Sequence, residues 1–212
     1  MKGGAQKPRG EMSRGSSSVA GSAGGSGSAG GALWVFGYGS LIWRPGLDFS
    51  ERREGYVRGF RRVWYQGSTD HRGTPERPGR TVTLQPAEGG EVWGAAYRLE
   101  CDGDGGEAAA LKYLDHREKQ YDRRERLDVF GRDGSVVAPR ALVYIGTPEC
   151  ENYLGPASPQ ELATQIAAAV GPSGPNSEYL FNLAEAMRGM DVEDSELFEI
   201  EALCRRVLHG RK

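Results

Sequence analysis

The pattern of hydrophobic and polar positions changes abruptly near residue 32 of this chain. The preceding residues are Gly, Ser and Ala with scattered Lys and Arg, and they include almost no large apolar side chain. Such a segment cannot bury enough surface to offset the entropy that folding costs. We therefore predict a disordered tail over residues 1–31 and a single domain over residues 32–212, a length suited to one sizeable core.

A continuous apolar run opens the predicted domain. Leu33–Phe36 are aromatic, aliphatic or β-branched, which is typical of a strand buried on both faces. The run breaks at Gly37-Tyr38-Gly39-Ser40, where two glycines widen the accessible backbone conformations. A strand that ends in this way exposes backbone N–H groups, which suit a carboxylate or another oxyanion. An ordinary strand followed by a tight turn explains these residues equally well.

The middle of the domain alternates β-rich segments with glycine-rich breaks. The predicted elements are a loop over 45–54, a strand over 56–65, a polar loop over 66–80, strands over 81–85 and 91–99, a helix over 107–121, and strands over 123–130 and 140–145. Gly89-Gly90 predicts a hairpin turn between the two strands that flank it.

The last third is predicted to be helical. Ser158-Pro159-Gln160-Glu161 is a capping box at the start of a helix that ends near Val170. We expect Asn176 or Ser177 to cap the next helix and a final helix to cover 195–208. Strands followed by a helix, more strands and more helices indicate an α+β domain, built on an antiparallel sheet or a small barrel.

Composition and charge exclude several classes of protein. The formal net charge of −2 argues against a dedicated nucleic-acid binder, so we interpret the arginines of 56–65 as stems that cover apolar surface. No apolar run approaches the ~20 residues that span a membrane. The three widely spaced cysteines fit neither a metal site nor a disulfide framework, which favours a reducing compartment such as the cytoplasm. Alternatively, the basic, Ser-rich leader is an organellar transit peptide.

Glu118 is the most informative candidate for chemistry. Leu111 and Leu114 define the apolar face of the predicted helix, and position 118 projects from the same face. Burial would raise the pKa of such a carboxyl toward the range that suits a general base near neutral pH. A helix-end glutamate paired with a nearby cation is the alternative. Asp115 and Lys119 are predicted to form a solvated pair on another face.

Other chemistry has weaker support in the sequence. His71 and His116 have no convincing Ser or Cys nucleophile motif nearby, and no group of residues has the spacing of metal ligands. Gly37-x-Gly39 lacks the third glycine of a dinucleotide fingerprint. We therefore expect no metal and no cofactor. Tyr144 ends a predicted strand, where a phenol either packs in the core or lines a site.

Several segments, in matching order, resemble the ChaC family. They are Val35–Trp43, Trp64–Gly73, Val92–Arg98, Tyr113–Tyr121, Tyr153–Pro156 and Gly171–Leu180, so the likeness covers about residues 33–208. ChaC proteins are glutathione-specific γ-glutamylcyclotransferases with a small β-barrel flanked by helices. The resemblance implies the same fold and the same cleavage of glutathione to 5-oxoproline and Cys-Gly.

The resemblance also implies a set of site residues. The family's acid/base glutamate matches Glu118, and its turn that binds the γ-glutamyl group matches Tyr38-Gly39-Ser40-Leu41. The residues expected to bind substrate are Val35, Phe36, Gly37, Tyr38, Gly39, Ser40, Leu41, Arg72 and Tyr144. Arg72 is expected to recognise the glycine carboxylate through bidentate pairing. We expect a monomer that binds glutathione and neither nucleic acid nor membrane.

Two other functions are consistent with the same residues. A cyclotransferase of the same scaffold could act on other γ-glutamyl amino acids or on γ-glutamylamines. A non-catalytic protein that binds γ-glutamyl ligands is the other alternative, although a mere binder has no use for an unpaired buried carboxylate such as Glu118.

Overall fold

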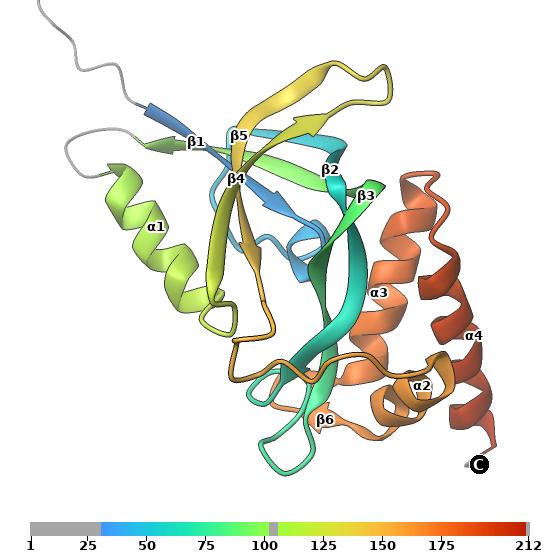
Figure 1. Ribbon diagram of the computed structural model, residues 1–212. Coiled ribbons are helices and arrows are strands. Elements are labelled where there is room, and N and C mark those ends of the chain that lie inside the picture. Colours follow the sequence, from blue (N-terminus) through green and yellow to red (C-terminus); the bar gives the residue numbers. More distant parts are fainter. Residues whose placement is uncertain (1–30, 102–105, 211–212) are drawn as a thin grey trace, which may run out of the picture.

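The computed structural model describes residues 31–101 and 106–210 (Figure 1). Its first strand, β1 (Gly31–Gly37), contains the apolar run that the sequence analysis singled out. Leu33, Val35 and Phe36 are fully buried, as that run predicted. The predicted disordered tail lies outside the described residues except for Gly31, which is the first residue of β1.

Five strands close into a barrel in the order β1-β3-β2-β4-β5. They are β1, β2 (Glu51–Ser68), β3 (Gly79–Cys101), β4 (Arg123–Phe130) and β5 (Val136–Ile145). Val35 of β1 lies opposite Tyr97 of antiparallel β3 and beside Leu142 of parallel β5. The barrel closes between β2 and β4, where Tyr56 pairs with Phe130. The predicted α+β class with a small mixed barrel is confirmed.

The predicted hairpin at Gly89-Gly90 is wrong. Residues 79–101 form one continuous strand, β3, which pairs with β2 on both sides of these glycines. The register moves from Arg58 opposite Glu91 to Phe60 opposite Pro86, so the extra residues form a bulge. Gly89 has φ of +68°, a conformation that glycine adopts without the steric cost of a Cβ atom. The glycines therefore bend the strand without reversing it.

The other strand predictions need smaller corrections. The loop predicted over 45–54 is shorter, because β2 begins at Glu51. Of the arginines in 56–65, which were interpreted as apolar cover, only Arg58 lies over a ring of the described residues: its guanidinium carbon is 3.9 Å from the centroid of Phe130. Arg61 instead bonds Gln85, and Arg62 forms an ion pair with Asp194. Arg53, which precedes that segment in β2, also lies over a ring, with its guanidinium carbon 5.3 Å from the centroid of Trp34.

Helices cover two sides of the barrel. Helix α1 (Gly106–Arg117) lies on one side, and α2 (Pro159–Ala168), α3 (Asn176–Gly189) and α4 (Ser195–His209) lie together on the other (Figure 1). The short strands β6 (Val170–Gly171) and β7 (Gly174–Pro175) form a tight hairpin between α2 and α3. This hairpin brings residues 171–174 against the loop that follows β2, because Ser173 N donates to the carbonyl of His71.

The helix caps were predicted only in part. The capping box of Ser158 and Glu161 is present at the start of α2. The predicted cap of α3 by Asn176 or Ser177 is wrong, because Pro175 occupies the N-cap position. Asn176 is fully buried, and its side chain bonds both the N–H and the carbonyl of Arg80 at 2.7 and 2.8 Å. A polar residue beside a helix start thus joins α3 to the barrel.

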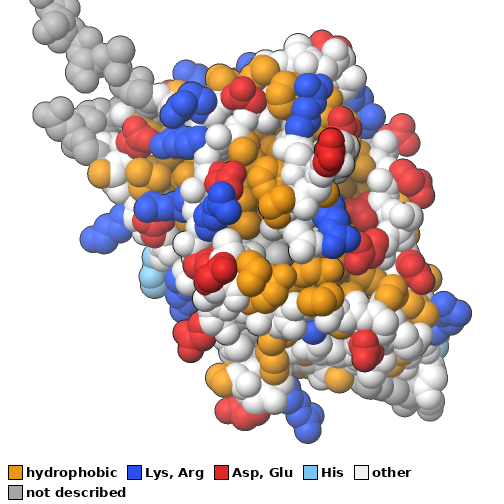
Figure 2. Space-filling model, viewed as in Figure 1, with side chains coloured by type: hydrophobic (Ala, Val, Ile, Leu, Met, Phe, Trp, Pro, Cys, Tyr) orange, Lys and Arg blue, Asp and Glu red, His pale blue; other side chains and the backbone are white. Residues whose placement is uncertain are grey.

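Apolar side chains of the barrel and the helices share one core. Val35, Tyr97 and Val143 are fully buried inside the sheet, while Leu114 of α1 and Leu183 of α3 are fully buried where the helices pack. On the face drawn in Figure 2, charged side chains of both signs are interspersed with apolar ones. None of the described helices is both long and apolar enough to cross a membrane.

The closure of the barrel provides a test of the fold. A Cβ atom on Gly55 would lie 2.5 Å from the carbonyl oxygen of Phe130 and 2.8 Å from a methyl of Val129. We predict that Gly55→Ala lowers the free energy of unfolding by about 1–3 kcal/mol, because β4 backbone must move. Gly189→Ala is the control. A Cβ atom on Gly189 would meet no atom within 4 Å apart from its chain neighbours and its own helix backbone, so this variant should be neutral or stabilising by up to about 1 kcal/mol. Urea unfolding measures the stability of both variants. Equal stabilities of Gly55→Ala and Gly189→Ala would contradict the close packing of β2 against β4 at Gly55.

Candidate active site

Glu118 stands at the end of α1, one residue past its last helical position. Its N–H still donates to the carbonyl of Leu114 at 2.8 Å, and its own carbonyl accepts from Tyr121 at 2.9 Å. The helical spacing from the buried Leu114 is therefore kept, and the side chain turns toward the core. Only 13% of the Glu118 side chain is exposed, in agreement with the predicted face.

The surroundings of Glu118 favour a protonatable carboxyl. Burial raises its pKa above the usual value, and the charge and hydrogen bond of Arg117 offset part of that rise. Arg117 Nε lies 3.2 Å from Glu118 Oε1, while the rest of its guanidinium donates to the carbonyls of Arg44 and Pro45. The cation is thus fixed by main chain on one side and contacts one carboxylate oxygen on the other.

The turn after β1 is held by its carbonyl groups. The 3₁₀ helix η1 (Ser40–Ile42) begins directly after Gly39. Tyr97 OH donates to the carbonyls of Leu41 and Ile42 at 2.8 and 3.1 Å, and Arg62 Nε donates to that of Tyr38 at 3.1 Å. The first N–H groups of a helix have no acceptor within it, so this rigid turn keeps donors that suit an anion.

Two cavities meet at Glu118. The inner one has a volume of about 30 Å³ and is lined by Phe36, Gly37, Tyr38, Gly39, Ser40, Leu41, Glu118, Tyr121 and Tyr144. The outer one has a volume of about 290 Å³ and is lined by Ser40, Trp43, Arg44, Ser68, His71, Arg72, Thr81, Tyr113, Arg117, Glu118, Gln120, Tyr121, Ser173 and Tyr179. Ser40, Glu118 and Tyr121 line both, so the two cavities are adjacent. Their combined size is at the lower end of the range for small-molecule sites.

Tyrosines surround the carboxyl. Burial is the main cause that raises the pKa of Tyr38, Tyr121, Tyr144 and Tyr179, and the charge of Glu118 adds to it in each case. All four phenols therefore stay neutral at physiological pH and can act as hydrogen-bond donors. Tyr38 OH donates to the carbonyl of Tyr144 at 2.6 Å, which ties the turn after β1 to the end of β5.

Asp115 and Lys119 do not form the predicted pair. Tyr144 OH donates to Asp115 Oδ1 at 2.7 Å, and Asp115 also forms an ion pair with Arg124 of β4. Lys119 Nζ instead lies 2.8 Å from Asp70 Oδ2 in the loop after β2. The predicted spacing failed because α1 ends at Arg117, so position 119 leaves the helical geometry.

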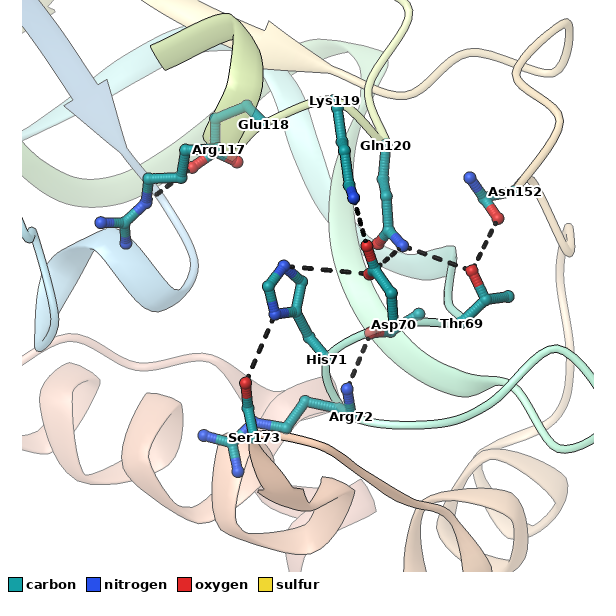
Figure 3. A network of polar contacts seen from close by, with 11 residues as sticks. Thr69, Asp70, His71, Arg72, Arg117, Glu118, Lys119, Gln120, Asn152 and Ser173 are labelled. Atoms are coloured by element: carbon teal, nitrogen blue, oxygen red, sulfur yellow. Dashed lines mark hydrogen bonds and ion pairs between the residues drawn. The ribbon is translucent and has the colours of Figure 1, made fainter. Parts of the chain in front are cut away.

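The loop after β2 forms the wall opposite α1 (Figure 3). Asp70 contacts Lys119 and Gln120, which fixes this loop to the segment that carries Glu118. His71 Nδ1 lies 3.3 Å from Ser173 Oγ, and this contact joins the loop to the β6–β7 hairpin. These contacts join three segments far apart in sequence, and the turn after β1 adds Ser40, Trp43 and Arg44 to the wall of the outer cavity.

Arg72 lines the outer cavity, as expected of a binding residue, but its charge is already paired. Its guanidinium lies 2.6 Å from Glu178 Oε2 and donates to the carbonyl of Pro175 at 3.1 Å. In Figure 3 its side chain lies beside Ser173, on the helical side of the cavity. The expected role at a glycine carboxylate stays a prediction, and it requires competition with Glu178.

The structure brings most of the expected site residues together. Glu118, Tyr144 and the segment 36–41 line the inner cavity, whereas Val35 is fully buried in β1 and lines neither of the two. The sequence analysis missed Arg62, Tyr97 and Tyr179, which hold the turn or line the cavity. Nothing local marks them, because their roles depend on β2, β3 and α3 meeting at one place. Among the described residues, no group of three His, Cys, Asp or Glu could hold a metal ion.

This chain belongs to the ChaC-like protein family, whose sequence profile matches residues 33–207. The protein named Gamma-glutamylcyclotransferase 2-3 of Arabidopsis thaliana is 47% identical over 183 residues, which cover 84% of this chain and 90% of that relative. The human protein named Glutathione-specific gamma-glutamylcyclotransferase 1 is 44% identical over 176 residues, covering 80% of this chain and 77% of the relative. The predicted family is thus confirmed.

Comparison with a solved structure supports the same fold. A yeast γ-glutamyl cyclotransferase specific to glutathione superposes with a TM-score of 0.75 at 28% sequence identity. The match covers 84% of this chain and 98% of the yeast chain. Nearly all of the yeast protein therefore has a counterpart among the barrel and helices described above.

The burial of Glu118 predicts a pH-dependent effect on stability. Its folded-state pKa lies above the unfolded value, so the fold favours the protonated form. The contribution of this protonation to the free energy of unfolding is fully present below the unfolded-state pKa of Glu118. It is lost as the pH rises through the folded-state pKa. We therefore predict that Glu118→Gln raises Tm at neutral pH, and that the advantage shrinks toward acidic pH.

Thermal unfolding between pH 4 and pH 8 measures this difference. Glu88→Gln is the matched control, because Glu88 is exposed on β3 and should give no pH-dependent gain. A Glu118→Gln variant that is less stable than the parent at neutral pH would show that the ionised carboxylate is stabilised by its surroundings instead.

Proposed function

We propose that this protein cleaves glutathione by cyclisation of its γ-glutamyl group, which releases 5-oxoproline and Cys-Gly. The observation that carries the proposal is the buried carboxyl of Glu118, which lies where the inner cavity of the turn meets the outer cavity. Relatives named as glutathione-specific γ-glutamylcyclotransferases, which match most of this chain, support the same reaction.

Binding would place the γ-glutamyl group beside Glu118, where the inner and outer cavities adjoin. The N–H groups of the turn Tyr38–Leu41 suit an anionic group of the substrate or the oxyanion that develops at its γ-carbonyl. Hydrogen bonds from Arg62 and Tyr97 to the carbonyls of this turn hold it rigid before substrate arrives. The Cys-Gly part would then extend into the larger outer cavity.

The reaction needs little more than orientation and proton transfer. The α-amine of the γ-glutamyl group is its own nucleophile, and a bent conformer brings it to the γ-carbonyl. The Glu118 carboxylate takes a proton from the α-ammonium, and the free amine attacks to form the ring C–N bond. The bond to the cysteinyl nitrogen then breaks as Glu118 donates its proton to that nitrogen. Glu118, ionised again, takes the second proton of the ring nitrogen as the lactam forms and passes it to the departing amine. Cys-Gly therefore leaves as an ammonium, and charge balances.

The proposal includes no metal, no cofactor and no covalent enzyme intermediate, since each step uses groups of the substrate and of Glu118. We further propose that the protein is a cytoplasmic monomer that binds neither nucleic acid nor membrane. The formal net charge of −2 supports the absence of nucleic-acid binding. Alternatively, residues 1–31 direct the protein to plastids. The localisation of the chain expressed with and without this segment would decide between the two compartments.

An assay of 5-oxoproline release tests the function. We expect release from glutathione, little release from γ-glutamyl-alanine, and no loss after dialysis against a chelator. Glu118→Gln should bind glutathione with similar affinity and lose turnover by at least about 100-fold, the typical contribution of a general acid–base group.

Three outcomes would contradict the proposal in different ways. Full activity of Glu118→Gln would remove that residue from the chemistry. Release mainly from γ-glutamyl-alanine would keep the reaction and change the substrate to other γ-glutamyl amino acids. Binding of glutathione without turnover by the folded parent protein would favour a non-catalytic γ-glutamyl-binding protein.

The pH dependence of the reaction tests the pairing of Glu118 with Arg117. The base must be ionised in the free enzyme, so kcat/KM falls as pH drops through the raised pKa of Glu118. Arg117 opposes the rise in the pKa of Glu118. Arg117→Gln should therefore shift this acidic fall in kcat/KM to higher pH. Arg117→Lys keeps a cation and should move it less. If a folded Arg117→Gln variant shows the same pH dependence as the parent, the acidic fall in kcat/KM belongs to another group.

A further inference from the structure

Arg44 lines the outer cavity, two residues beyond η1. Its main chain is fixed on both sides: its N–H donates to the carbonyl of Ser40 at 2.9 Å, and its carbonyl accepts from Arg117 at 2.5 Å. The side chain itself is exposed. Within residues 31–101 and 106–210, its guanidinium forms no ion pair and no hydrogen bond. A free cation therefore projects from a rigid support.

The other cations of the cavity wall are engaged. Arg72 is held by Glu178 and the carbonyl of Pro175, and it lies deeper in the wall, with 8% of its surface exposed. Arg117 contacts Glu118 and the carbonyls of Arg44 and Pro45. His71 bonds Ser173 and faces Asp70. Of the described cationic side chains that line this cavity, Arg44 is the one whose charge has no partner.

The direction of the substrate brings an anion to this cation. If the proposed function holds, the γ-glutamyl group lies beside Glu118, and the peptide extends through the larger outer cavity. Glutathione ends in a carboxylate on its glycine, at the far end from the reacting carbonyl. The exposed side chain of Arg44 lines this outer cavity and is therefore available to that carboxylate. Guanidinium groups pair with carboxylates through two parallel hydrogen bonds.

We propose that Arg44 binds the glycine carboxylate of glutathione and thereby selects the tripeptide over shorter γ-glutamyl compounds. This inference rests on the proposed function, and it transfers to Arg44 a role that the sequence alone suggested for Arg72. The contact is remote from the reacting atoms and is made equally in substrate and transition state. Its loss therefore raises KM and leaves kcat nearly unchanged.

The test combines a change in the protein with a change in the substrate. The parent protein, Arg44→Ala and Arg206→Ala are each assayed with glutathione and with the analogue whose glycine carboxylate is an amide. Arg206 is the matched control, because it is an exposed arginine on α4, outside the walls of both cavities. Thermal unfolding confirms that each variant is folded.

We expect the parent protein and Arg206→Ala to prefer glutathione over the amide by roughly 5- to 10-fold in kcat/KM, the scale of one partly exposed charged hydrogen bond. Arg44→Ala should lose that preference through a higher KM for glutathione, with the KM for the amide unchanged, and Arg44→Lys should keep part of it. A full preference in Arg44→Ala would overturn the inference. Loss of the preference in Arg72→Ala alone would return the carboxylate to Arg72.

Binding measurements separate this inference from the proposed function. Titration calorimetry of the Glu118→Gln protein, with and without Arg44→Ala, compares the affinities for glutathione and for the amide without any turnover. A preference for glutathione that depends on Arg44 would support the inference even if the parent protein releases no 5-oxoproline. If the protein with Arg44 binds glutathione no more tightly than the amide, the inference is overturned. The 5-oxoproline assay tests the reaction independently.

Discussion

The buried carboxyl of Glu118 is the constraint around which this site is built. An ionised carboxylate in an apolar surrounding costs free energy unless polar groups compensate for it. Arg117 compensates only in part, since it contacts one oxygen and also donates to two main-chain carbonyls. The remaining proton affinity is what a base needs to take a proton from an ammonium and return it to a leaving amine.

The barrel supplies the rigidity that this carboxyl requires. Arg62 on β2 is nearly buried and joins three parts of the molecule: the carbonyl of Tyr38 in the turn, the carbonyl of Trp93 on β3, and Asp194, which caps α4. A helix far from the cavity is thereby connected to the turn that faces Glu118. The helical layer therefore supports the site as well as covering the core.

The walls of the cavity divide the recognition of substrate between rigid and polar parts. The inner cavity is formed by strand and turn residues whose positions the barrel fixes, which suits the group that reacts. The outer cavity is lined by the turn after β1, the loop after β2, the β6–β7 hairpin and the end of α1. Contacts of Asp70 and His71 join the last three. Three arginines line this cavity: Arg44, Arg72 and Arg117. Arg72 is paired with Glu178 and supports the wall, whereas the guanidinium of Arg44 has no partner among the described residues.

The sequence by itself determined the first strand, the turn at Gly37–Ser40, the helix that precedes Glu118 and the family, because each depends on local pattern or on motifs in order. It misjudged Gly89-Gly90, since a glycine pair permits a bulge as readily as a hairpin and only pairing with β2 selects the bulge. The partners of Arg62, Arg72 and Asn176 were decided by tertiary structure alone. These contacts join residues up to 132 positions apart, and no local pattern records which distant carboxylate or carbonyl a buried polar group will meet.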